Sequence, residues 1–283
     1  MNRNELEASV LASFKGEIEA FKPGNVSVYA EGHDMTVRDF IDSAEVSSPI
    51  LCQSATGLGQ RVLESVKATR AAVGCNTNLG MLLLFAPIIM AAESDFCDID
   101  GLRRNLERVL ESLSQKDADQ VFEAIRIASP GGLGSTESQD VNKSPDCSLK
   151  EAMELASGRD SIALQYTNNF KEIFDLGFPS IKCFDNSWNS VKWSTVSCFM
   201  MFMSSIVDSH IKRKYGEQLA EQIRRKSTVI AEKLHEASEP ETELNLIKGF
   251  DEELKAEGVN PGTSADLTAA SLLVYTLTGK KNL

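Results

Sequence analysis

The chain has 283 residues, of which 42% are hydrophobic and 25% are charged, a composition typical of a folded globular protein and too apolar for a disordered one. Its formal net charge of -12 repels nucleic acid and anionic membranes, so we expect neither as a partner. An anionic ligand would therefore need a local basic pocket.

The cysteines, the N-terminal segment and the apolar runs argue against a zinc-binding, a disulfide-bonded, a secreted and a membrane-spanning protein. The six cysteines are scattered, with no C-x-x-C pair and no histidine at zinc spacing, so we expect reduced thiols. The N-terminal segment carries Glu5, Glu17 and Glu19 in a helical pattern and does not resemble a secretory signal. The most apolar run, 79–92, is shorter than the roughly 20 residues needed to cross a bilayer. We expect a cytoplasmic protein.

Helical periodicity dominates the chain. In the segment 98–114, leucines recur on one helical face and charged residues occupy the other, with Asp100 as the expected N-cap. The only weak strand pattern, at 25–30, is equally consistent with an ordered loop. Helices are predicted in chain order at 3–21, 36–53, 57–73, 76–93, 98–114, 116–129, 148–156, 160–176, 188–208, 215–236, 240–257 and 263–278.

These elements predict an all-α fold. We expect one multi-helix globular domain over residues 1–283, because no segment has the composition of an interdomain linker. The helices near 76–93 and 190–207 are apolar enough to be central. An apolar face left over from this packing would leave a homodimer open as an alternative to a monomer.

Three glycine-containing loops could hold a phosphate at a helix start: KPGN at 22–25, TGLGQ at 56–60 and SPGGLG at 129–134. None matches the Walker A or the dinucleotide-binding pattern. Taken singly, each loop is more typical of a helix connector. The polar segment 135–148 is expected to be an exposed loop.

Two His-Asp pairs are candidates for proton or metal chemistry. His33 precedes Asp34 in the first loop region, and Asp208 stands two residues before His210. A helix cap or an orienting hydrogen bond explains each pair equally well. Magnesium would need several such oxygen ligands to converge, which spacing alone does not establish.

Six fragments in one order cover nearly the whole chain: KPGNVS followed by GHDM, then NTNLG, SPGGLG, RDSIALQY with NNF, DSHI with RK, and NPGTSADL. Together they resemble the triphosphoribosyl-dephospho-CoA synthase family, all-helical enzymes that prepare the prosthetic-group precursor of citrate lyase and malonate decarboxylase. The resemblance implies that a ribose hydroxyl of dephospho-CoA attacks the anomeric carbon of the ATP ribose and that adenine leaves. It also implies Mg2+ as the cofactor, with Lys or Arg on the triphosphate.

The family motifs also suggest site residues. We expect Lys22 to contact phosphate, His33 to be catalytic, and Asp34 and Asp208 to be metal ligands or the catalytic base. The substrate-binding residues expected from the motifs are Lys22, Gly24, Asn76, Thr77, Gly80, Arg159, Asp160, Gly262, Ser264 and Asp266.

The chain departs from the citrate-lyase branch at Asn78 and Leu79, where that branch carries His and Lys, and SPGGLG replaces its Arg-Gly-Glu segment. The sequence instead resembles a divergent branch of archaea and of bacteria with archaeal-type one-carbon coenzymes. Two alternatives stay open: a step in the biosynthesis of a pterin or furan one-carbon coenzyme, and a noncatalytic helical protein that binds a nucleotide.

Overall fold

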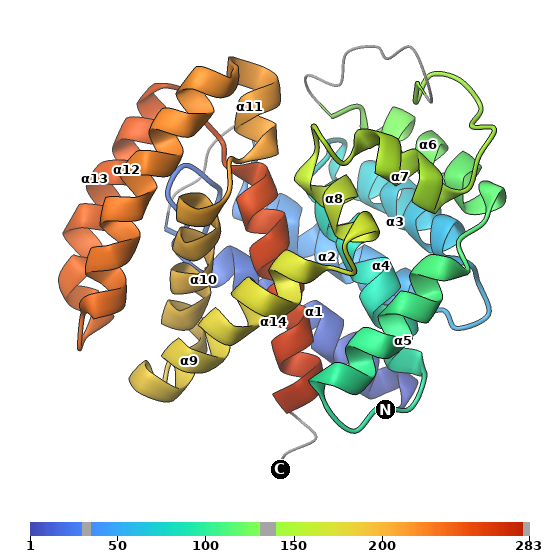
Figure 1. The fold of residues 1–283 in the computed structure, drawn as a ribbon, viewed down its shortest axis with the longest axis horizontal. Helices are drawn as coiled ribbons and strands as arrows, with labels where there is room; N and C mark the ends of the chain where they lie inside the picture. Colours follow the sequence, from blue (N-terminus) through green and yellow to red (C-terminus); the bar gives the residue numbers. More distant parts are fainter. Residues whose placement is uncertain (30–34, 131–139, 280–283) are drawn as a thin grey trace.

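The computed structural model describes residues 1–29, 35–130 and 140–279. Within these ranges the chain forms helices joined by loops and no β-strand (Figure 1), which confirms the all-α prediction. The helices are α1 (Arg3–Glu19), α2 (Val37–Leu51), α3 (Leu58–Val73), α4 (Leu79–Glu93), α5 (Ile99–Glu111), α6 (Gln115–Ala128), α7 (Leu149–Ala156), α8 (Ser161–Thr167), α9 (Phe178–Trp188), α10 (Val191–Ser205), α11 (Ser209–Tyr215), α12 (Glu217–Glu236), α13 (Leu244–Ala256) and α14 (Gly262–Gly279).

Side-chain caps fix where many of these helices begin. Reciprocal capping boxes open α1, α2, α6 and α7, where the N-cap side chain and an acidic side chain three residues later each bond the other's backbone N-H. Helix α5 is capped by Asp98, whose Oδ1 accepts from the Gly101 amide at 2.7 Å. The predicted cap, Asp100, lies instead within the first turn.

The prediction of one helix over 160–176 was wrong. Helix α8 ends at Thr167, Asn169 and Phe170 both have φ of 56°, and a π-helical turn follows over Ile173–Gly177. The turn lies close against α14, since a Cβ at Gly177 would stand 2.7 Å from the Ser271 Cβ. A further break near Asn189, at φ 48°, separates α9 from α10.

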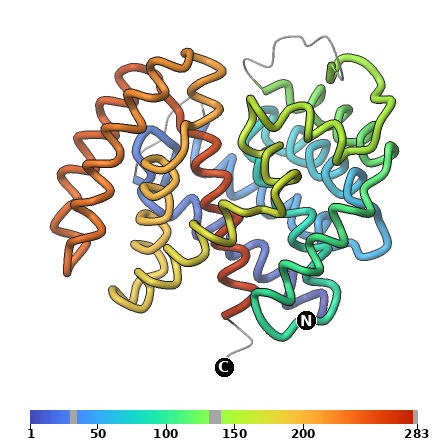
Figure 2. Tube along the Cα trace, in the orientation of Figure 1, coloured from blue at the N-terminus to red at the C-terminus, as the bar shows by residue number. Residues whose placement is uncertain are grey.

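Buried apolar residues form two clusters. The first joins mainly α1 to α8, and the second joins mainly α11 to α13, while α10 and α14 contribute to both. Figures 1 and 2 show α14 running between the two groups of helices. The predicted central helices are confirmed: α4 is buried almost all round, and most of α10 is buried.

Helix α14 is a third central helix that the sequence did not single out. It alternates leucines with Ala, Ser and Thr, and several of its hydroxyls donate to carbonyls one turn back. Thr268 donates to the Ser264 carbonyl at 2.7 Å, and Ser271 donates to the Leu267 carbonyl at 2.8 Å. The small side chains allow close packing on both sides. No helix among the described residues is long and apolar enough to cross a membrane.

Candidate functional site

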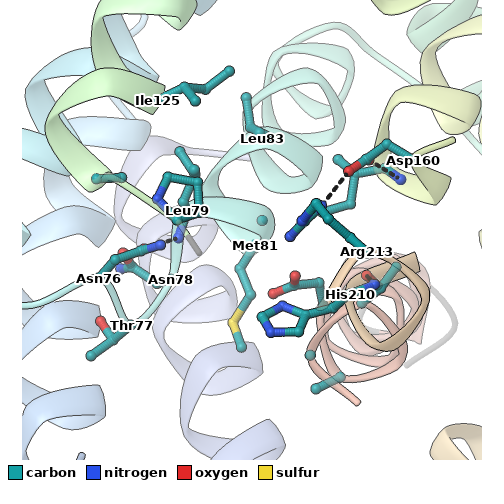
Figure 3. Close-up of a pocket in the computed structure, with 18 of the residues that line it drawn as sticks. Asn76, Thr77, Asn78, Leu79, Met81, Leu83, Ile125, Asp160, His210 and Arg213 are labelled. Atoms are coloured by element: carbon teal, nitrogen blue, oxygen red, sulfur yellow. Dashed lines mark hydrogen bonds and ion pairs between the residues drawn. The ribbon is translucent and has the colours of Figure 1, made fainter. Parts of the chain in front are cut away.

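A cavity of about 890 Å³ opens between the two groups of helices, a size typical of small-molecule sites. One wall comes from residues 75–81 and from α6, α7 and α8, and the other from α11 and the start of α14. In Figure 3, Asn76, Asn78 and Leu79 lie on one side, and His210 and Arg213 on the other. The predicted residues that line this cavity are Asn76, Thr77, Gly80, Arg159, Asp160, Gly262 and Asp266.

Other predicted residues lie elsewhere. His33 and Asp34 fall outside the residues that the structure describes. Lys22, Gly24, Asp208 and Ser264 are described but are not part of the cavity lining.

Lys22 lies beneath the site, with no exposed surface. Its Nζ is 3.0 Å from the Glu17 carboxylate and donates to the carbonyls of Glu17 and Val26 at 2.8 and 3.0 Å. Burial lowers the pKa of Lys22, while the charge of Glu17 opposes that shift. This geometry favours a structural role for Lys22 over the predicted contact with phosphate.

The KPGN loop reaches the cavity through Asn25 rather than Lys22. Gly24 supplies the turn at φ 77°, and its amide donates to Asp251 Oδ1 at 2.8 Å. Asn25 Nδ2 donates to Asn260 Oδ1 at 2.8 Å, so the KPGN and NPGTS segments meet at the cavity edge.

Asp208 joins the DSHI motif to the NPGTSADL motif. Its Oδ1 accepts from the amides of His210 and Ile211, which caps α11, and its Oδ2 accepts from the Ser264 amide and hydroxyl at 2.8 Å. Burial raises the pKa of Asp208, and these hydrogen bonds oppose the shift. With both oxygens engaged, the geometry favours a structural role over the predicted roles as base or metal ligand.

The NTNLG segment shapes the start of α4. Thr77 donates to Ser43 Oγ at 2.6 Å, and Asn76 Oδ1 accepts from the Leu79 amide at 3.1 Å. Gly80 leaves room for a carboxyl group from α14: a Cβ at Gly80 would overlap Asp266 Oδ2 and lie 2.5 Å from Asp266 Cγ. Gly80 and Asp266, far apart in sequence, are therefore in direct contact.

In the part of the chain that the structure describes, the cations that line the cavity are Arg70, Arg159, Lys212 and Arg213. Arg213 is 3.1 Å from Asp160, whose other oxygen caps α8 through the Ile162 and Ala163 amides. Arg70, Lys212 and Arg213 were not among the predicted site residues, although the last two lie inside the DSHIKRK segment that carried the resemblance. Arg70, at the end of α3, gave no sequence signal.

Among the described residues, the carboxyl groups that line the cavity belong to Asp140, Asp160 and Asp266. The pKa of Asp266 is raised well above its usual range, first by burial and then by the negative charges of Glu17, Asp208 and Asp160, while Arg213 opposes the shift. Burial and the neighbouring negative charges therefore disfavour the ionised form of this carboxyl.

Comparisons with known proteins agree with these motifs. The family model described as ATP:dephospho-CoA triphosphoribosyl transferase matches residues 3–283. A crystal structure of a candidate triphosphoribosyl-dephospho-CoA synthase from Archaeoglobus fulgidus is similar, with 28% identity and a TM-score of 0.65, and the match covers 84% of this chain and 98% of that one. No curated protein matches the chain. The family expected from the sequence motifs is confirmed, and the chain belongs to the ATP:dephospho-CoA triphosphoribosyl transferase family.

Proposed function

We propose that this protein transfers a triphosphoribosyl group from ATP to dephospho-CoA, with loss of adenine. The observation that carries the proposal is the cavity itself, in which family motifs from both halves of the chain meet. It gathers several cations from the described residues, in a protein of net charge -12. Such a local concentration of positive charge suits a triphosphate.

The triphosphate would lie against α11 and the loop before α8. Arg159, Lys212 and Arg213 converge there, and Arg70 stands on the wall formed by α3. The Arg213 guanidinium is oriented by Asp160 at 3.1 Å, and a planar guanidinium can bond two phosphate oxygens at once. These cations bind and orient the donor, and the transferred sugar keeps its phosphates throughout.

Mg2+ would enter with the triphosphate. Across the three described stretches, no group of three His, Cys, Asp or Glu side chains is placed to hold a metal ion. Mg2+ commonly uses one or two carboxylates together with substrate phosphates, and Asp140 could supply such a ligand from the lining. When bound, Mg2+ would supply charge neutralisation on the triphosphate.

The acceptor hydroxyl would approach the ribose from the wall that carries Asn76 and Thr77. This wall is held firmly, because Thr77 is bonded to Ser43 and Asn76 to the first turn of α4. Fixed walls hold two reactants in the geometry that a bimolecular displacement needs.

The decisive experiment incubates the protein with ATP, Mg2+ and dephospho-CoA and separates free adenine by chromatography. We expect adenine release that depends on dephospho-CoA, together with a product that carries the added triphosphoribosyl mass. Arg213→Gln should lose most of this activity, whereas Arg225→Gln, an arginine on the outer face of α12 with a 76% exposed side chain, should keep it. ATP binding without adenine release from any acceptor would contradict the proposal and favour a noncatalytic nucleotide-binding protein.

A further inference from the structure

The Asp266 carboxyl differs from the other carboxyl groups of the cavity in its partners. Asp160 is paired with Arg213 and caps α8, and Asp140 accepts from the amide and side chain of Asn142 at 2.9 Å. Within the described ranges, no group donates a hydrogen bond to Asp266. Its oxygens remain available to a ligand in the cavity.

The surroundings of Asp266 disfavour its ionised form. Three acids face it from three elements: Glu17 of α1, Asp160 before α8, and Asp208 before α11. Arg213 is the opposing cation, and its charge is shared with Asp160. A carboxylate at this position would be both desolvated and repelled, so the neutral acid is the stable form.

The same carboxyl is fixed in place by close packing. A Cβ at Gly80 would overlap Asp266 Oδ2 and stand 2.8 Å from Ile162 Cδ1, so the Asp266 side chain occupies space that a larger residue at 80 would fill. The carboxyl thus lies against the first turn of α4 and lines the same cavity as the cations of α11. A rigidly held neutral acid in a ligand cavity has the properties of a general acid.

The transfer reaction needs such a group. When the bond between the anomeric carbon and adenine breaks, the electron pair goes to the adenine nitrogen, which must gain a proton for adenine to leave as a neutral base. Asp160 is poorly placed to supply it, because its carboxylate is paired with Arg213 and accepts from two helix amides.

We propose that Asp266 is the general acid that protonates the departing adenine. This inference rests on the proposed function. The O-H bond of Asp266 and the bond to adenine break, an N-H bond forms on adenine, and the acceptor oxygen bonds the anomeric carbon. The acceptor proton passes to solvent, from which Asp266 regains its proton, so the cycle consumes only ATP and the acceptor and releases adenine.

A leaving-group comparison tests this role. Wild type and Asp266→Asn are assayed with ATP and with the 5-triphosphate of p-nitrophenyl riboside, whose nitrophenolate leaves without being protonated. We expect Asp266→Asn to slow the ATP reaction by about 10²- to 10⁴-fold, the usual contribution of a general acid to the rate. The reaction of the nitrophenyl donor should be slowed far less. Equal losses with both donors, or no loss with ATP, would overturn the proposal.

Two further readouts separate proton donation from a structural role. In wild type the rate of the ATP reaction should fall as pH rises through the raised pKa of Asp266, and this fall should be absent from the residual rate of Asp266→Asn. His210 of α11, a titratable group that also lines the cavity, is tested in parallel by His210→Gln, in which the rate should still fall as pH rises. ATP affinity by calorimetry should change little in Asp266→Asn.

A measurement without turnover completes the test. The infrared difference spectrum between wild type and Asp266→Asn at neutral pH should contain the carbonyl stretch of a protonated carboxylic acid, and its absence would overturn the proposal. Asp185→Asn is the matched control, since Asp185 contacts α14 outside the cavity through Tyr275 and should keep the wild-type rate with both donors. A wild type that releases no adenine contradicts the proposed function itself, whereas an active wild type with equal losses in Asp266→Asn contradicts only the general acid.

Discussion

Replacing Lys22 by methionine tests whether this residue supports the fold or contacts phosphate. The change keeps most of the length of the side chain but leaves the Glu17 carboxylate buried and without its counter-ion at 3.0 Å. Breaking a buried ion pair in this way costs about 3–5 kcal/mol. The carbonyls of Glu17 and Val26 also lose a donor, so the upper part of that range is expected.

The double variant Glu17→Leu with Lys22→Met removes both charges together. It should recover a large part of the loss, because replacing a buried pair by apolar residues is often close to neutral, although the two carbonyls still lack their donor. Unfolding in urea, followed by circular dichroism, measures all members of the cycle. Lys15→Met, which breaks an exposed pair with Glu45, is the control and should change stability little.

One combination of stability and binding results would contradict a structural role for Lys22. If Lys22→Met unfolded at the wild-type urea concentration while ATP affinity fell tenfold or more, Lys22 would contact the nucleotide, as the motifs predicted. A stability loss with ATP affinity kept in the folded variant supports the structural role.

Three other changes test the cavity. Arg213→Gln should weaken ATP binding by about ten- to a hundredfold in calorimetry, the worth of a charge-assisted hydrogen bond, and unchanged affinity would remove Arg213 from the donor site. Gly80→Ala should displace Asp266, where a Cβ would stand 2.5 Å from its Cγ, and should lower kcat more than ATP affinity. Gly249→Ala, with open space around its Cβ, is its control, and equal rates for both variants would contradict the packing argument. The folded state binds the Asp266 proton more tightly than the unfolded chain does, so the stability from this proton is full below the unfolded pKa and is lost as pH rises through the folded pKa. Asp266→Asn should therefore lose less stability than wild type as pH rises in urea titrations, and parallel curves would show that the proton is not held.

Much of the fold follows from local patterns. Amphipathic spacing and capping residues predict where α5 and α6 lie, because both signals depend only on neighbours in sequence. The break after Thr167 has no comparable local signal, and the π-helical turn that follows it packs against α14. Left-handed backbone at Asn169 and Phe170 is stabilised by contacts that no local pattern records.

The site could be predicted only in part, because sequence motifs also do not record tertiary contacts. Motifs located Asn76, Arg159 and Asp266, which line the cavity, but they did not distinguish a residue that faces a ligand from one that holds the wall. Lys22 and Asp208 are buried and bonded within the protein and are not part of the cavity lining, which favours the second kind for both. Burial and the direction of a side chain depend on tertiary structure, so a motif alone does not separate the two kinds.

The position of α14 has a consequence for the order in which the protein can assemble. Helix α14 packs against α1 and contributes to both apolar clusters, yet it emerges from the ribosome after every other described helix. The apolar face of α1 is therefore fully covered only after α14 has been synthesised. Since the start of α14 also brings Asp266 and Gly262 to the cavity, a nascent chain cannot bind its substrates at this site until synthesis has passed α14.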